Sequence, residues 1–374
     1  MSEYQYYEFQ AIDRPLTQEE RAAISQLSSR VKPTATSASF TYSYGNFRGD
    51  PKQVLARYFD IMYYIANWGT QQLMFRFPTS LINREAIELY CIDNYISLSF
   101  AGDWAILDWE FSQEEGFNDW IEGEGILSEL IGLRQEILQQ DYRGLYLAWL
   151  KAIDLSEGYI DIDKTQLEPP LPPGLGQLSA AQKAFTEIFE LDEHLLNVAC
   201  ASSGKLTTIS KQTWQQAITQ LSASEREDFL LRLAKGEHNL SAKFQQKLSQ
   251  LIPNSPASNQ PRRTIQELLE AASEEEKKAE KRRQQEAEAK RIEELQTLAK
   301  REAQVWQQVE SLIQKAQSKS YDEAVKLLVK LRDLAEYQNR LPVFQERLNR
   351  IYEQYSNRSG LKRRLQEVGL TDSK

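Results

Sequence analysis

Apolar and polar residues alternate along several stretches of the first 164 residues, and this period of two predicts β-strands. The predicted strands cover residues 4–12, 40–44, 71–77, 86–92, 95–101 and 104–112. Asp93-Asn94 and Gly102-Asp103 separate the last three of these and suit the two-residue turns of hairpins. We therefore expect an antiparallel meander inside a mixed or antiparallel sheet.

Helical patterns, with apolar residues three or four positions apart, lie between these strands. Thr17 begins a capping box and a helix that we expect to end near Ser29. Asp50-Pro51 begins a second helix. Its inner face is predicted to carry Val54, Tyr58, Ile61 and Ile65. Helices at 126–139 and 142–155 should cover the sheet, so residues 1–164 are predicted to form an α+β domain.

Two proline-rich segments, 168–176 and 253–261, interrupt the rest of the chain. Between them the pattern predicts helices at 180–199, 211–221, 224–235 and 240–251, with Ser210 and Ser224 as caps. The sequence thus predicts an α+β domain (1–164), a Pro/Gly linker (165–178), a helical domain (179–251), a flexible linker (252–263), a long charged helix (264–316) and a helical tail (317–374).

The predicted long helix contains no Pro and no Gly, and as one unbroken helix it would measure about 80 Å at 1.5 Å per residue. Thr264 and Glu267 form a capping box at its start. Between residues 273 and 291 the only apolar residues are three alanines. This middle part has nothing to bury, so it is either a solvated helical spacer or partly disordered.

The last third of this helix carries an apolar stripe that we call the seam. Its residues are Ile292, Leu295, Ala299, Trp306, Val309 and Ile313, which follow alternating three- and four-residue steps when Glu302 is included as the one polar position. Such spacing is typical of a short coiled coil, formed with a partner, with a second copy or with this chain's own tail. Because Trp306 is costly to leave in water, we expect it to pack within its own chain.

The tail should supply the matching apolar surface and form a small helical bundle. Leu327, Leu331, Leu334, Phe344, Leu348 and Ile351 lie at helical spacing in two predicted helices. A short third helix at 361–368 contains Lys362, Arg363 and Arg364. These three cations could contact phosphates or simply be solvated.

Charge is unevenly distributed along the 374 residues. Residues 1–164 carry 13 Lys and Arg against 25 Asp and Glu, a net charge of −12, whereas residues 262–374 carry 24 against 20, a net charge of +4. Cys91 and Cys200 are expected to be free thiols in a reducing compartment. The first residues lack the pattern of a signal peptide, and no apolar run is long enough to span a membrane, so we expect a cytoplasmic protein without a membrane partner.

Candidate chemistry is sparse. Asp103, Asp108 and Glu110 lie at and just after a predicted hairpin turn, and the last two share one strand face. Paired carboxylates can hold a hard cation, which suggests a metal-assisted hydrolase acting on a phosphate ester; the alternative is a solvated strand face. His194 and His238, the only histidines, lack neighbours at ligand or triad spacing, so we predict no metal site and no cofactor.

A large core without convergent polar chemistry, beside a long polar helix, favours an interaction or adaptor protein over an enzyme. We therefore expect a protein partner as the main interpretation. Nucleic acid is a weaker possibility, and the hydrolase is the alternative.

Three segments resemble a group of uncharacterised bacterial proteins: Tyr4-Gln-Tyr-Tyr-Glu-Phe-Gln-Ala-Ile-Asp-Arg-Pro-Leu, Ile65-Ala-Asn-Trp-Gly-Thr and Leu171-Pro-Pro-Gly-Leu-Gly. The tail, with Tyr321-Asp-Glu-Ala-Val and Leu331-Arg-Asp-Leu-Ala before Leu365 and Gly369-Leu370, resembles the C-terminal region of some bacterial SWIM zinc-finger proteins. That resemblance implies a docking module serving a nucleic-acid-associated partner. The zinc ligands of the SWIM motif, a Cys-x-Cys followed by a Cys-x-His, are absent from this sequence.

Overall fold

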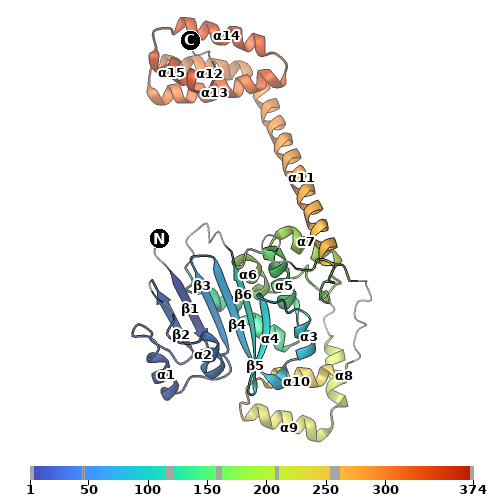
Figure 1. The fold of residues 1–374 in the computed structure, drawn as a ribbon. Helices are drawn as coiled ribbons and strands as arrows, with labels where there is room; N and C mark the ends of the chain where they lie inside the picture. Colours follow the sequence, from blue (N-terminus) through green and yellow to red (C-terminus); the bar gives the residue numbers. More distant parts are fainter. Residues whose placement is uncertain are drawn as a thin grey trace. The chain divides into compact units, whose positions relative to one another are not determined.

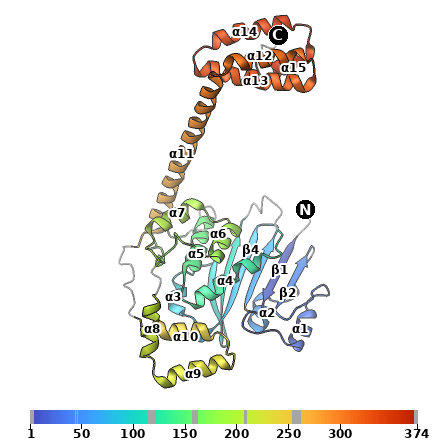
Figure 2. The same cartoon turned by 180° about the vertical axis from the view of Figure 1, so that it is seen from behind.

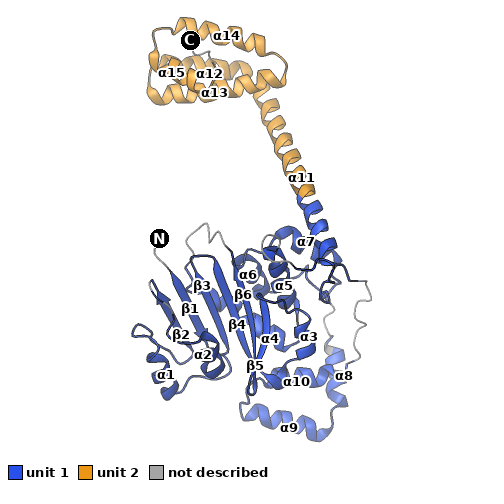
Figure 3. Ribbon diagram, viewed as in Figure 1, with its two compact units in different colours: residues 1–276 blue, residues 277–374 orange. Residues whose placement is uncertain are grey.

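A computed structural model describes residues 4–43, 45, 47–113, 122–156, 162–206, 210–252 and 262–370 (Figure 1). The chain divides into two compact units, Met1–Glu276 and Lys277–Lys374 (Figure 3). Most of the predicted flexible linker at 252–263 lies outside the described residues.

The first unit is built on one antiparallel sheet of six strands in the order β2-β1-β3-β4-β6-β5. The strands are β1 (Gln5–Gln10), β2 (Ser37–Tyr42), β3 (Ile61–Ala66), β4 (Thr70–Pro78), β5 (Ile96–Ala101) and β6 (Trp104–Ser112). The predicted α+β class is confirmed, and β5 and β6 pair as the predicted hairpin.

Two local predictions around the sheet are wrong. Residues 86–92 do not form a strand, because Asn83 caps the short helix α3 (Arg84–Glu88) by accepting from the Ala86 N–H. The helix that begins at Pro51, α2 (Pro51–Tyr58), ends before Ile61. Ile61 and Ile65 belong to β3 instead, which is buried along its whole length. A strand buried on both faces has a continuous apolar run instead of an alternating pattern, so its four-residue spacing imitated a helix.

Helices lie on both faces of the sheet (Figures 1 and 2), and each face has its own core. On one face, Tyr63, Phe75 and Trp109 pack beneath α4 (Ile126–Leu138), α5 (Arg143–Ser156) and α6 (Ala180–Ile188). On the other face, Phe9 and Met62 pack with α1 (Gln18–Ser25) and α2. Helices therefore protect both faces of the central strands from water.

The helical middle joins this unit through α6 and α7 (Glu193–Ser202), which replace the single predicted helix at 180–199. Glu190 adopts the left-handed conformation, with φ of +49°, and Asp192 caps α7, so the chain turns between the two helices. Phe185 stacks on Phe189 and lies edge-on to Trp109. This stretch consequently shares the core of the sheet.

Three further helices, α8 (Lys211–Gln220), α9 (Ala223–Ala234) and α10 (Leu240–Ser249), form a small group with a minor core around Leu221 and Leu248. Ser210 caps α8 as predicted, but the cap of α9 is Ser222 instead of Ser224. Ser222 completes a capping box with Glu225.

The predicted helix at 264–316 is two helices, α11 (Ile265–Ala299) and α12 (Glu302–Gln314), separated by a turn at Lys300-Arg301. Thr264 and Glu267 form the predicted capping box at the start of α11. Residues 280–291 are all exposed, as expected for a stretch with so few apolar side chains.

The second unit has a separate core, to which α12, α13 (Ser318–Tyr337), α14 (Leu341–Gln354) and α15 (Ser359–Glu367) all contribute. Leu295 and Leu298 at the end of α11 also belong to this core. This is the helical-bundle tail that the sequence predicted.

Candidate functional site

The structure brings two of the three predicted carboxylates together. Gln72 Nε2 donates to Asp108 Oδ1 at 2.8 Å and to Glu110 Oε2 at 3.2 Å, and Lys52 Nζ lies 3.7 Å from Asp108 Oδ2. Asp103 lies in the β5–β6 turn, five residues from Asp108, which is about 16 Å along an extended strand. Asp103 therefore does not join the pair.

Burial raises the pKa of Asp108, and burial together with the neighbouring Asp108 raises the pKa of Glu110. Both carboxylates already accept a hydrogen bond from the same amide. Within the described ranges, no cluster of three or more His, Cys, Asp or Glu side chains could hold a metal ion. Metal-assisted hydrolysis by these residues stays an untested prediction.

The seam residues separate into two environments. Leu295, Trp306, Val309 and Ile313 are buried in the core of the second unit, whereas Ile292 and Ala299 are partly exposed. Trp306 is 2 % exposed, and its ring centroid lies 5.7 Å from that of Phe344. The Arg347 guanidinium lies 4.4 Å from the Trp306 ring, so α14 of the same chain covers this side chain.

The three predicted phosphate-contacting cations each have a neighbour within the second unit. Lys362 Nζ lies 4.7 Å from the centre of the Tyr352 ring. Arg363 pairs with Glu367 at 3.4 Å, and Arg364 pairs with Asp322. The Arg363 side chain is 71 % exposed in this pair, and a phosphate contact by these residues stays a prediction.

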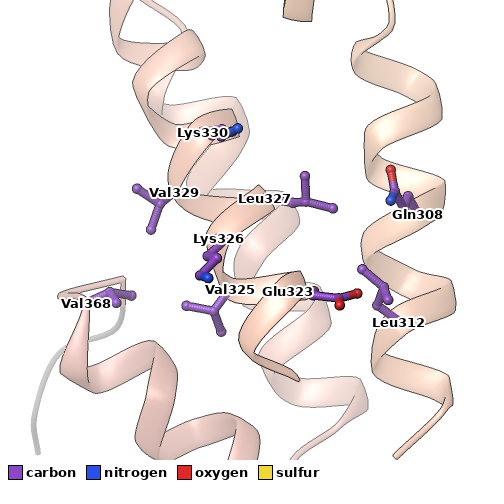
Figure 4. A pocket seen from close by; sticks show the side chains of 9 residues that line it. All are labelled: Gln308, Leu312, Glu323, Val325, Lys326, Leu327, Val329, Lys330 and Val368. Atoms are coloured by element: carbon purple, nitrogen blue, oxygen red, sulfur yellow. The ribbon is translucent and has the colours of Figure 1, made fainter. Parts of the chain in front are cut away.

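An open groove of about 520 Å³ lies on the second unit, along α12, α13 and the end of α15. Figure 4 shows Leu327 pointing toward Gln308 and Leu312 of α12, while Val325 lies on the side of α13 that faces Val368. Glu323, Lys326 and Lys330 add charged groups. The lining therefore combines apolar side chains from both sides of α13 with charged groups.

Helix α9 of the first unit exposes three leucines, which we call the α9 face although they extend round more than one side of the helix, since Leu231 and Leu233 are about 200° apart. Leu230 and Leu233 are each 65 % exposed and Leu231 is 54 % exposed, and none of the described residues of this helix is buried. The side of α9 toward α10 instead carries Phe229, which packs on Phe244, and Arg232, which pairs with Glu237. Sequence periodicity predicted this helix but could not show which side faces water.

A buried polar network lies where strands end in the first unit. Asp60, immediately before β3, accepts from Arg76 Nη2 at 2.7 Å and from the backbone of Ile12 and Asp13 at 2.6 and 2.9 Å. Arg134 of α4 donates to both oxygens of Asp13, at 2.9 and 2.8 Å. The sequence signal was a single charge inside each of two apolar runs, Phe59-Asp60-Ile61 and Phe75-Arg76-Phe77.

Comparison with known proteins gives no identity: no family model, no curated protein and no solved structure matches this chain. The resemblance to bacterial proteins therefore stays a prediction. In the part of the chain that the structure describes, the helices are too short or too polar to cross a membrane.

Proposed function

We propose that this chain is a non-catalytic adaptor that inserts the α9 face into an apolar groove of a partner protein. The main observation behind this proposal is that Leu230, Leu231 and Leu233 are exposed on one helix. Exposed apolar clusters of this kind mark interaction surfaces.

The energetic argument comes from the orientation of α9. Fully burying a leucine side chain is favourable by ~1.5–3 kcal/mol, and the fold forgoes most of this for all three leucines. The inward side meanwhile holds an Arg232–Glu237 ion pair, with Arg232 Nε 2.6 Å from Glu237 Oε2. A partner that covers the leucines would recover the missing burial.

A groove on another protein would cover α9 better than the α9 helix of a second copy would. Stable interfaces typically bury about 800 Å² on each partner, and three leucines on a 12-residue helix provide much less than that. A groove that encloses the helix from both sides adds contacts to its flanks, where Glu227 and Lys235 are exposed. We therefore favour a different protein over a second copy.

The adaptor role rests on a second apolar surface in the other unit. The groove beside Leu327 belongs to a separately cored bundle, so it could receive a second partner (Figure 4). Cys91 and Cys200 are free thiols, which supports a reducing compartment such as the cytoplasm. A nucleic-acid-associated partner would fit the resemblance of the tail.

Photocrosslinking in the source cells tests this proposal. A photoreactive residue at Leu230 should give one discrete adduct heavier than the chain, formed with a different protein. Leu233→Glu in the same chain should reduce the adduct at least tenfold, because it places a charge in the apolar contact. A peptide of residues 222–236 should compete in lysate, whereas the peptide with Glu at 230 and 233 should not.

The matched control is the same photoreactive residue at Leu89, a similarly exposed leucine at the end of α3. The adduct should be absent there. An adduct with the mass of two copies would show a homodimer and contradict the proposal. Equal labelling at Leu230 and Leu89, or no adduct at Leu230, would contradict it as well.

A further inference from the structure

A cavity of about 440 Å³ lies beside the buried polar network of the first unit. It is bordered by the ends of β1, β4 and α2, by the start of β6, and by the loop between α9 and α10. The residues that matter here are Arg14, Arg57, Arg76, Trp104, His238 and Lys243. A volume of this size is within the range of small-molecule sites.

Arg76 gives this cavity a fixed, buried cation. Its side chain is 6 % exposed, with Nη1 donating to the Ala56 carbonyl at 2.9 Å and Nη2 donating to Asp60. The Nε–H group is buried and has no hydrogen-bond partner among the described residues. An unpaired buried donor is costly, so this edge of the guanidinium is short of an acceptor in the folded chain.

Trp104 adds a flat aromatic wall. Its ring lies 4.2 Å from the Arg76 guanidinium carbon, and the side chain is only partly buried. Arg and Trp stacked in this way hold each other in place. The wall offers a surface for a planar organic group next to the cation.

The charges around the cavity do not cancel. Four cations line it, Arg14, Arg57, Arg76 and Lys243, against two anions, Asp13 and Glu237, which leaves a surplus of two positive charges. In the next shell, Glu20 and Asp60 pair with Arg14 and Arg76, while Arg134 and Arg232 pair with Asp13 and Glu237. Asp228 also pairs with Arg232, so the surplus over both shells is one positive charge. The positive surplus is local. Residues 1–164, which supply most of the lining, carry a net charge of −12.

We infer that this cavity binds a small organic phosphate monoester, with the phosphate among Arg57, Arg76 and Lys243 and the planar group against Trp104. A phosphate dianion suits this positively charged lining, and its three acceptor oxygens can bond to several donors at once, one more oxygen than a carboxylate offers. Arginine guanidinium groups recognise phosphate oxygens through several parallel donors. This site is separate from the leucines that carry the proposed interaction.

Isothermal titration of the full chain with adenosine 5′-monophosphate tests the inference, because this probe combines a phosphate with a planar base. Saturable binding is expected, and inorganic phosphate should compete for it. Adenosine, which lacks the phosphate, should bind at least tenfold more weakly. Arg57→Gln should also weaken binding at least tenfold, since this exposed side chain supplies one of the surplus charges.

Arg84→Gln is the matched control, because Arg84 is an exposed arginine on α3 that does not line the cavity. It should bind the probe as the unchanged protein does. The inference is overturned if neither the nucleotide nor phosphate binds saturably at millimolar concentration. It is also overturned if the Arg57→Gln variant binds the nucleotide with unchanged affinity while its circular dichroism spectrum shows that it is folded.

Discussion

Replacing Asp60 with Asn is expected to lower the free energy of unfolding of the first unit by about 3–5 kcal/mol, the usual cost of removing one partner of a buried ion pair. Asp60 is fully buried and accepts hydrogen bonds from Arg76 and from two backbone N–H groups. The amide would leave the Arg76 and Arg134 guanidinium groups without their shared anion. Chemical denaturation at pH 7 measures this loss.

The stabilisation by Asp60 should also depend on pH. Burial alone would raise the pKa of Asp60, but Arg134 and Arg76 more than offset burial and hold this pKa below its ordinary value. The folded-state pKa is therefore lower than the unfolded one, which is about 3.9. The contribution is fully present above the unfolded pKa and is lost as the pH falls from about 4 through the folded pKa.

Asp103→Asn provides the control, because Asp103 lies exposed in the β5–β6 turn. A surface change of this kind should alter the free energy of unfolding by less than about 0.5 kcal/mol. If Asp60→Asn cost less than 1 kcal/mol at pH 7, the network would be far better hydrated than its burial indicates, and our account of it would be wrong.

Local chemistry explains which parts of the fold the sequence could predict. Thr17 and Thr264 each cap a helix with a glutamate three residues later, and Gly102-Asp103 turns the β5–β6 hairpin. These signals depend only on neighbouring residues. β3 was missed because its residues are buried on both faces, so its pattern depends on helices that are distant in sequence.

The candidate sites were harder to predict for the same reason. Asp13, Asp60, Arg76 and Arg134 are spread over more than 120 residues, and the strand order together with the packing of α4 on the sheet brings them together. Asp103, Asp108 and Glu110, in contrast, are close in sequence, yet an extended strand keeps Asp103 away from the other two. Closeness in sequence therefore did not predict which charged side chains lie together in the fold.

The seam shows a prediction that was right in its residues and wrong in its geometry. Its three- and four-residue steps indicated one continuous helix, but the chain turns at Lys300-Arg301 between α11 and α12. Helices α12 and α13 pack against each other in one bundle, and the turn allows Leu298 and Trp306 to contribute to the same core. Periodicity alone could not reveal this turn, because neither residue is a helix breaker.

Trp306→Ala is expected to destabilise the second unit by about 3–5 kcal/mol, the usual cost of deleting a large aromatic side chain from a core. Trp306 is 2 % exposed, and Phe344 and Arg347 of α14 contact its ring. The two units have separate cores, so the first should keep its stability. Hydrogen exchange of peptides from residues 302–354 and from the sheet measures the two effects separately.

The molecular mass in solution decides whether this burial is intramolecular. Because Phe344 of the same chain already covers Trp306, sedimentation should give the same mass before and after the substitution. Val343→Ala is the matched control, since Val343 is exposed beside Phe344 on α14 and its loss should change exchange little. A dimer that Trp306→Ala converts to a monomer would show instead that a second copy completes the core.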